Sequence, residues 1–156
     1  MSTSSPKLCF AASSGGHYEQ LMMLKPLMER YDSFVLTERT QYQAKDRGTR
    51  TYYVPQINRK ERMVLLKLIG NGFRCLGIFL KERPDVIICT GVLAMLPMCL
   101  LMKLFGRKLI YIESFAKVTS ATESGQLLYR FADRFYVQWD SMKRSYPNAI
   151  CLGSIY

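Results

Sequence analysis

The run Leu8-Cys9-Phe10-Ala11-Ala12 leads directly into Ser13-Ser14-Gly15-Gly16-His17, and an amphipathic stretch from Glu19 to Arg30 follows. A short apolar run, a glycine pair and a helical pattern predict a strand, a tight turn and the start of a helix. Such a turn aims backbone N–H groups and the positive end of the helix at an anion. A phosphate-bearing ligand is therefore the first expectation, although an ordinary Ser/Gly turn before a helix needs no ligand.

Further apolar, β-rich runs recur along the chain and alternate with segments of helical period. The runs are Leu8–Ala12, Ser33–Leu36, Thr51–Val54, Asp85–Cys89, Lys108–Ile112, Arg134–Val137 and a short one within Ala149–Gly153. Their alternation predicts an α/β fold, a Rossmann-like parallel sheet with helices on both faces. The 156 residues suit one domain. We expect it over residues 7–156, after a disordered N-terminus of residues 1–6.

The chain carries 22 Lys and Arg against 12 Asp and Glu, a net charge of +10. Between Arg39 and Arg83, eleven basic residues stand against three acidic ones, so +8 of this charge falls in one stretch. Such an excess suits nucleic acid, anionic lipid headgroups or a diphosphate-bearing ligand. No recognition motif accompanies the charge, so we expect no nucleic-acid partner. Within the basic stretch, the polar segment Thr40–Arg50 is expected to form an exposed loop.

A helix with two distinct faces is expected over Arg59–Lys81. The face predicted to pack on the sheet holds Leu66, Ile69, Phe73, Leu76 and Leu80. A basic stripe, predicted to face outward as a membrane surface, holds Lys60, Lys67, Arg74 and Lys81. Apolar residues flank this stripe, namely Met63, Val64 and Ile78. The mixture is typical of an interfacial helix, although an ordinary solvated helix face has the same spacing.

Several classes of site and segment are disfavoured by the sequence. The five cysteines lie in apolar runs without a C-x-x-C pair, which indicates buried thiols and argues against zinc. Only Gly15 and Gly16 remain of the G-x-G-x-x-G pattern, which argues against an NAD-dependent oxidoreductase even though Glu38 lies where a ribose-binding acid would. We therefore expect no metal and no cofactor. The apolar run from Val92 is too short to span a bilayer, and no signal peptide is apparent.

Ligands of open α/β sheets bind at the carboxyl ends of the strands. Three loops are expected to meet there, and they contain Ser13–His17, Thr90-Gly91 and Glu113-Ser114. His17 is the only histidine. It suits a neutral base or hydrogen-bond acceptor, although a lone histidine at this position also serves as a cap or surface residue. Glu113 can act as a base, as an acceptor for sugar hydroxyls or as the cap of the next turn, and binding is favoured over catalysis.

From Lys7 to Tyr156, a series of short motifs resembles one family. The motifs are Ser13–His17 with Gln20-Leu21, Asp85–Gly91, Tyr111–Ser114, Ala132-Asp133 with Val137–Trp139, and Gly153–Tyr156. The chain resembles the membrane-associated acceptor subunit of split glycosyltransferases, the bacterial capsule and exopolysaccharide proteins of the PssD/EpsE type. These are similar to the eukaryotic asparagine-linked glycosylation subunit that anchors an N-acetylglucosaminyltransferase.

The resemblance implies a GT-B transferase divided between two chains, of which this one is the N-terminal, Rossmann-like half. It would bind an undecaprenyl-diphosphate-linked sugar at the inner, cytoplasmic face of the cell membrane, while a partner chain supplies the UDP-sugar site. The loop Gly15-Gly16-His17 resembles the G-G-H loop that approaches the acceptor diphosphate in the peptidoglycan N-acetylglucosaminyltransferase. The resemblance makes His17 the expected catalytic residue. The expected acceptor-binding residues are Ser13, Ser14, Gly15, Gly16, Thr90, Gly91, Glu113 and Ser114.

The chain departs from these relatives in two places. Glu113 matches the acid of the H-E-Q-N loop in the peptidoglycan enzyme, but Ile112 and Ser114 replace its neighbours, which argues against catalysis by Glu113. We also expect the chain to lack the N-terminal membrane anchor of the eukaryotic members, so membrane contact is expected from Arg59–Lys81 and Val92–Phe105. The alternative function is a non-catalytic activator and membrane anchor of a partner transferase, because the same loops can position an acceptor without supplying a base.

Overall fold

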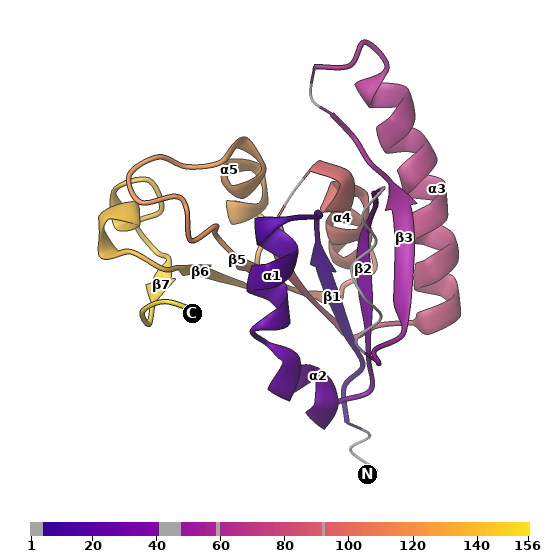
Figure 1. Ribbon diagram of the computed structural model, residues 1–156, viewed down its shortest axis with the longest axis horizontal. Helices are drawn as coiled ribbons and strands as arrows, with labels where there is room; N and C mark the ends of the chain where they lie inside the picture. The colour runs from indigo at the N-terminus through magenta and orange to yellow at the C-terminus, as the bar shows by residue number, and fades with distance from the viewer. Residues whose placement is uncertain (1–4, 41–47, 59, 92) are drawn as a thin grey trace.

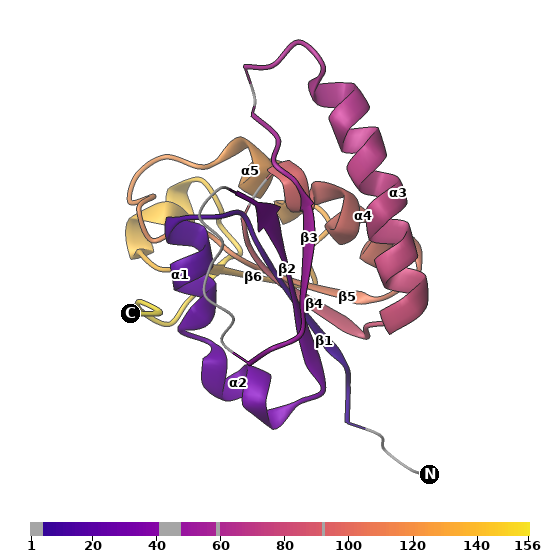
Figure 2. The same ribbon diagram turned by 45° about the vertical axis from the view of Figure 1, so that its right-hand side comes forward.

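The computed structural model describes residues 5–40, 48–58, 60–91 and 93–156. Within these residues, seven strands form one parallel sheet in the order β3-β2-β1-β4-β5-β6-β7 (Figures 1 and 2). The strands are β1 (Leu8–Ala12), β2 (Ser33–Arg39), β3 (Thr51–Pro55), β4 (Val86–Gly91), β5 (Lys108–Ile112), β6 (Arg134–Val137) and β7 (Ile150–Cys151). The helices are α1 (Gly16–Met22), α2 (Lys25–Arg30), α3 (Val64–Glu82), α4 (Leu96–Leu104) and α5 (Glu123–Tyr129), with short 3₁₀ helices η1 (Leu93–Met95) and η2 (Asp140–Arg144).

The predicted parallel sheet with helices on both faces is confirmed. Figures 1 and 2 show α1 and α2 on one face of the sheet and α3, α4 and α5 on the other. The strands β1, β5 and β6 have the predicted bounds, whereas β2 continues to Arg39 and β4 to Gly91. These longer strands carry Glu38 and Gly91 to the carboxyl edge of the sheet, on either side of the end of β1.

The central strands are apolar on both sides because both of their faces are covered. In β1, Cys9 and Ala11 pack with α3 and α4, while Phe10 and Ala12 pack with α1 and α2. A one-residue shift of this strand would exchange the two sets, so burial fixes its register.

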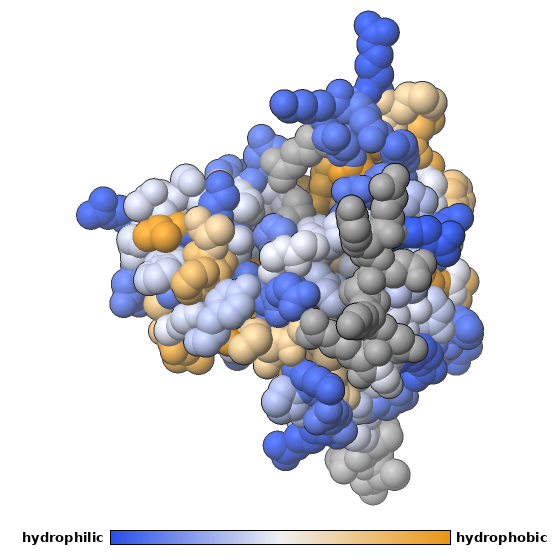
Figure 3. Space-filling model, in the orientation of Figure 1, coloured by the Kyte–Doolittle hydropathy of each residue, from blue (hydrophilic) through white to orange (hydrophobic). Residues whose placement is uncertain are grey.

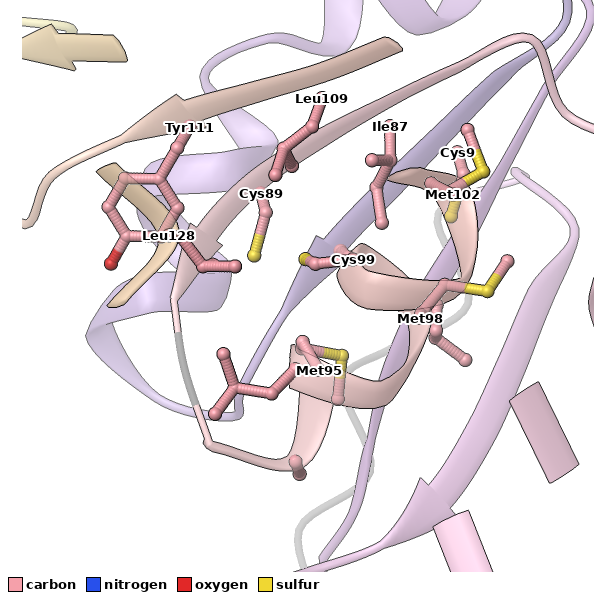
Figure 4. Close-up of a cluster of buried hydrophobic side chains, with 14 of the residues drawn as sticks. Cys9, Ile87, Cys89, Met95, Met98, Cys99, Met102, Leu109, Tyr111 and Leu128 are labelled. Carbon is pink, nitrogen blue, oxygen red and sulfur yellow. The ribbon is translucent and has the colours of Figure 1, made fainter. Parts of the chain in front are cut away.

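The layer between the sheet and α4 is rich in sulfur, as Figure 4 shows. Cys89 of β4 and Cys99 of α4 point toward each other there, and both are fully buried free thiols. Burial raises the pKa of the nearby Cys9 thiol well above its usual value. Cys9 therefore remains protonated. Burial was predicted for all five cysteines, and it is confirmed for four, which pack as small apolar side chains, whereas Cys151 is only half-buried.

The helix α3 begins at Val64, later than predicted, because Asn58 closes a turn before it. The Asn58 side-chain oxygen accepts a hydrogen bond from the Lys60 amide (3.3 Å), and its carbonyl accepts one from the Glu61 amide (3.1 Å). Arg59, the expected start, lies outside the described residues. So do residues 1–4 of the expected disordered N-terminus and residues 41–47 of the expected loop.

The predicted orientation of α3 is wrong. The residues expected to face the sheet are exposed instead, apart from the half-buried Leu76, and they are Leu66, Ile69, Phe73 and Leu80. The side that faces the sheet holds Asn71, Cys75, Phe79 and Glu82. Its two polar residues find partners inside the protein. Asn71 Nδ2 donates to the Pro55 carbonyl (3.1 Å), and Glu82 pairs with Lys7 (2.6 Å).

Candidate functional site

The glycine loop between β1 and α1 is bonded to both neighbouring strands at the carboxyl edge of the sheet. The Ser13 amide donates to the Gly91 carbonyl (3.0 Å), and the amide and hydroxyl of Ser14 each lie 3.4 Å from Oε2 of Glu38. Gly15 has a φ of 79°, a left-handed conformation that glycine tolerates. Gly15 and Gly16 are exposed, and the first N–H groups of a helix have no partner within it. Backbone donors at the start of α1 are thus open to a ligand.

His17 is fastened to the end of β4 through two hydrogen bonds. Its Nδ1 lies 2.9 Å from the Thr90 carbonyl oxygen, and Thr90 Oγ1 donates to the His17 carbonyl over 2.9 Å. Because a carbonyl only accepts, Nδ1 carries the proton, and Nε2 of the neutral ring keeps its lone pair. Among the described residues, none hydrogen-bonds to Nε2, and the side chain is half-buried. The fold therefore fixes Nδ1 in a hydrogen bond and leaves Nε2 available to a ligand.

Gly91 makes room for this imidazole. It has a φ of 137°, and a Cβ atom built on it would lie 2.9 Å from Nδ1 and 3.0 Å from Cε1 of His17. A side chain at this position would therefore displace the ring. Thr90 is completely buried, and its hydroxyl positions the backbone of His17 by donating to the His17 carbonyl from inside the protein.

The carboxylate of Glu113, directly after β5, points into the protein. The side chain is 1% exposed and accepts hydrogen bonds from Tyr146 Oη (2.6 Å), from Thr122 Oγ1 (3.1 Å) and from the Ser114 amide (2.9 Å). Burial and the Glu113 hydrogen bond raise the pKa of Tyr146, which therefore remains a donor. Of the three roles that the sequence left open for Glu113, this geometry matches the cap of the following turn. Ser114 is half-buried beside it.

Two glutamines, to which the sequence gave no role, meet at the backbone carbonyl of Glu113. Gln20 Nε2 donates to it over 3.3 Å and Gln138 Nε2 over 2.9 Å. The other side-chain atom of each amide accepts from a backbone N–H, that of Phe115 (3.3 Å) and that of Ile155 (3.0 Å). This network ties α1 to the loop after β5 and to the C-terminal residues. Both glutamines lie in the motifs quoted above, and that placement is the signal that could have identified them.

The structure brings the predicted site residues Ser13–His17 and Thr90-Gly91 together in direct contact, as expected. Glu38 is an additional residue of this edge, because it holds Ser14 and lies 3.5 Å from the Ile57 amide. Its signal in the sequence is an acidic residue at the end of the strand that pairs with β1. No three His, Cys, Asp or Glu side chains are grouped as metal ligands in the described part of the chain.

The predicted basic stripe is exposed and borders an apolar surface, and three of its four members lie on α3, while Lys60 lies in the turn before that helix. Its members Lys60, Lys67, Arg74 and Lys81 are all exposed, although Lys67 pairs with Glu61 and Lys81 Nζ lies 5.4 Å from the centre of the Tyr52 ring. Beside it lies what we call the apolar face, formed by Leu66, Ile69, Phe73, Leu80, Leu100 and Leu104. A groove of about 530 Å³ runs between α3 and α4 on this face. Figure 3 shows orange side chains interrupting the hydrophilic surface along the edge formed by α3, at the right of the view.

Where the chain is described, none of its helices combines the length and the apolar character that crossing a membrane requires. The basic stripe and the apolar face instead mark an amphipathic surface on α3 and α4. Apolar and cationic side chains lie side by side on this surface, a combination typical of helices that lie on a membrane.

Solved structures share this fold. MurG of Acinetobacter baumannii superimposes with a TM-score of 0.69 at 17% identity, over 87% of this chain and 43% of that one. UDP-GlcNAc 2-epimerase of Neisseria meningitidis, solved with UDP-GlcNAc, gives a TM-score of 0.72 at 10% identity, over 96% of this chain and 47% of that one. The chain thus spans less than half the length of these structures. The predicted fold class, Rossmann-like and of the GT-B kind, is confirmed.

Curated proteins show similarity in sequence as well. The human UDP-N-acetylglucosamine transferase subunit ALG14 is 26% identical over 173 residues, which cover 92% of this chain and 80% of that protein. The subunit alg14 of Schizosaccharomyces pombe is 42% identical over 77 residues, 46% of this chain and 37% of that protein. The family model described as "Oligosaccharide biosynthesis protein Alg14 like" matches residues 8–155. Because this match covers nearly the whole chain, the protein belongs to the Alg14 family.

Proposed function

We propose that this chain is the acceptor subunit of a two-component glycosyltransferase of the bacterial PssD/EpsE type. Residues 7–156 form a domain that binds an undecaprenyl-diphosphate-linked sugar, and a partner chain carries the UDP-sugar site. The pair adds the second sugar of a capsular or exopolysaccharide repeat unit. The family supports the division into subunits, because its human and fission-yeast members are named as subunits of a UDP-N-acetylglucosamine transferase.

The observation that carries this proposal is the geometry of His17. Its Nδ1–H is held by the Thr90 carbonyl (2.9 Å), so the Nε2 lone pair is directed away from that contact. In an inverting transfer, the acceptor hydroxyl oxygen bonds to the anomeric carbon while the bond to the UDP oxygen breaks. The hydroxyl proton passes to Nε2 of His17, which acts as the general base.

The acceptor diphosphate lies at the glycine loop in this proposal. Gly15 and Gly16 are exposed and carry no side chain, so the backbone N–H groups at the start of α1 can approach phosphate oxygens closely. The hydroxyls of Ser13 and Ser14 border the same loop and add polar contacts. Ser114 faces the sugar, and Glu113 is a positioning residue that holds the Ser114 amide (2.9 Å).

The proposed contact with the membrane is peripheral, at its inner face, and uses the apolar face together with the basic stripe. Exposed apolar side chains on α3 and α4 can enter the region between headgroups and acyl chains. The lysines and arginine beside them are attracted to anionic headgroups. This orientation of α3 supports membrane contact more directly than the predicted one, in which the apolar side chains faced the sheet.

Three incubations test which of the two chains is required for sugar transfer. The purified chain, the protein encoded beside it and the pair are each supplied with a lipid-diphosphate-linked glucose acceptor and labelled UDP-sugars. Transfer by the pair alone supports a split transferase. Equal transfer by the protein encoded beside it alone would leave this chain the role of non-catalytic activator and anchor. Transfer by this chain alone would contradict the proposal that it is one half of a divided transferase.

The role of His17 is tested with His17→Asn in the reconstituted pair. Asparagine keeps a donor for the Thr90 carbonyl but lacks the nitrogen that takes the proton, so turnover should fall by about 10²- to 10⁴-fold. Met23→Asn, which introduces the same side chain at an exposed position at the end of α1, should leave turnover unchanged. Wild-type turnover in His17→Asn would exclude His17 as the general base and favour the alternative of a non-catalytic activator and anchor.

A further inference from the structure

A second cavity lies beside the candidate site, on the side of the sheet that α3, α4 and α5 cover. It has a volume of about 330 Å³, at the low end of the range of about 300–1,000 Å³ for ligand pockets. Its lining consists of Val64, Leu93, Leu96, Glu123, Ser124 and Leu127. The first three and the last are apolar, and the polar groups come from α5 alone. This cavity suits a short hydrocarbon segment.

The walls of the cavity continue the loops that build the site. Leu93 begins η1, shortly after Gly91, whose carbonyl accepts from the Ser13 amide of the glycine loop (3.0 Å). On the opposite wall, Ser124 precedes Gly125, which packs tightly against the carboxylate of Glu113 and Tyr146 Oη. The segments that follow β4 and β5 therefore contribute both to the candidate site and to the walls of the cavity, at the same edge of the sheet.

The cavity and the groove on the apolar face are lined by the same two helices, α3 and α4. Leu96 in its wall is followed by Pro97, which lines the groove between α3 and α4. Val64 in its wall is followed by Leu65 and Leu66, which are both exposed. Consecutive residues of α3 and of α4 thus contribute both to the cavity and to the exposed apolar surface.

We propose that this cavity binds the first isoprene units of a prenyl-diphosphate ligand whose diphosphate lies at the glycine loop. This inference rests on the proposed function, since the diphosphate site is part of it. The rest of the lipid follows the groove between α3 and α4 into the bilayer. Each methylene-sized group removed from water in the cavity should tighten binding about fourfold.

Binding of soluble probes to the purified chain tests the cavity without any transfer reaction. Isothermal titration compares inorganic diphosphate with geranyl, farnesyl and geranylgeranyl diphosphate below the concentrations at which they aggregate. The Kd should fall more than tenfold from inorganic to farnesyl diphosphate, because the first isoprene units are removed from water in the cavity. Equal affinities, or no binding of any probe, would overturn the proposal.

Leu127→Gln places an amide in the cavity wall at a side chain that is 42% exposed, so the variant should fold. We expect it to weaken farnesyl diphosphate about tenfold and to leave inorganic diphosphate unchanged. Met23→Gln, on the opposite face of the sheet, should bind both as the wild type does. If Phe73→Gln on the apolar face weakens farnesyl diphosphate while Leu127→Gln does not, the chain lies on the surface and the cavity assignment is wrong.

Transfer by the pair separates this inference from the proposed function. With acceptors of one to four isoprene units, Leu127→Gln should raise KM about tenfold for the longer acceptors and leave kcat unchanged. Transfer that does not depend on lipid length would contradict lipid binding in the cavity and leave the proposed transferase function standing. No transfer from any acceptor, together with tight binding of farnesyl diphosphate, would contradict the proposed transferase function and support lipid binding in the cavity.

Discussion

Three residues decide the chemistry available at the carboxyl edge of the sheet. The Thr90 carbonyl selects the tautomer of His17 by accepting from Nδ1 (2.9 Å), and Gly91 leaves the space in which the ring lies. Neither Thr90 nor Gly91 needs to touch a ligand for this purpose. Their role in acceptor binding stays a prediction, and what the structure shows is that they position the ring of His17, the proposed base.

Gly91→Ala should therefore lower turnover of the reconstituted pair about as strongly as His17→Asn does. The new Cβ would lie 2.9 Å from Nδ1 of His17, and the φ of 137° strains any other residue by about 1–3 kcal/mol. Turnover and urea unfolding are measured together. Gly106→Ala is the control, because Gly106 also has a positive φ (68°) but a Cβ atom on it would have nothing within 4 Å. The control should lose stability and keep turnover. Full turnover in Gly91→Ala would show that the position of the ring does not matter.

The orientation of α3 is the feature of an element that pattern alone could not give. Its strongest apolar stripe faces away from the sheet, and its buried side includes Asn71 and Glu82, whose partners Pro55 and Lys7 lie outside the helix. Periodicity reports where apolar side chains gather on a helix but not what covers them. The strands were predictable, by contrast, because apolar residues without alternation require cover on both faces.

The candidate site was predictable to the same extent. Parallel strands bring their carboxyl ends to one edge, so the meeting of Ser13–His17 with Thr90-Gly91 followed from the order of the elements alone. The inward direction of Glu113 did not, because its donors Thr122 and Tyr146 stand in loops without a repeating pattern. Side-chain direction at a loop depends on such long-range partners.

Charge reversal on α3 should weaken binding of the chain to vesicles that contain anionic lipid. The double variant Lys67→Glu with Arg74→Glu loses two exposed cations, each worth about 1 kcal/mol near an anionic surface, so binding should fall tenfold or more. Sedimentation with vesicles measures it. Lys25→Glu with Lys143→Glu makes the same change of charge at exposed lysines on other elements and should have little effect. Equal sedimentation of the two double variants would refute a membrane surface on α3.

At the scale of the whole molecule, three ion pairs lie at the edge of the sheet opposite the candidate site. Three carboxylates, those of Glu82, Asp85 and Asp133, lie near the amino ends of β4 and β6. Their cationic partners are Lys7 (2.6 Å), Arg107 (2.7 Å) and Lys103 (2.8 Å) respectively. Burial opposes ionisation of Glu82, but hydrogen bonds from Lys7 and Tyr52 outweigh it and hold the pKa below its usual value. These three carboxylates thus stabilise the amino edge, and stability can be changed there without touching the site.

Asp133 provides the test of this separation. Burial opposes ionisation of its carboxylate, but hydrogen bonds from Lys103, the Leu109 amide and Lys108 outweigh that effect and lower its pKa from 3.8 to about 2. Because the unfolded chain binds this proton more tightly, the stabilisation is complete above the unfolded pKa and is lost as the pH falls toward the folded one. Between about pH 5 and pH 2, the advantage of the wild type over Asp133→Asn in free energy of unfolding should shrink by about 2 kcal/mol.

Urea unfolding at several pH values measures this change, and Asp140→Asn is the control. Asp140 pairs with Lys143 (2.9 Å) but is 81% exposed, and solvent-exposed pairs contribute little to stability. The difference in free energy of unfolding between Asp140→Asn and the wild type should therefore change far less over the same pH range. Turnover of the pair at neutral pH should be the same for Asp133→Asn as for the wild type, since Asp133 lies at the edge opposite His17. A difference in unfolding free energy that stays constant down to about pH 2 would mean that the Asp133 pairs do not hold this edge together.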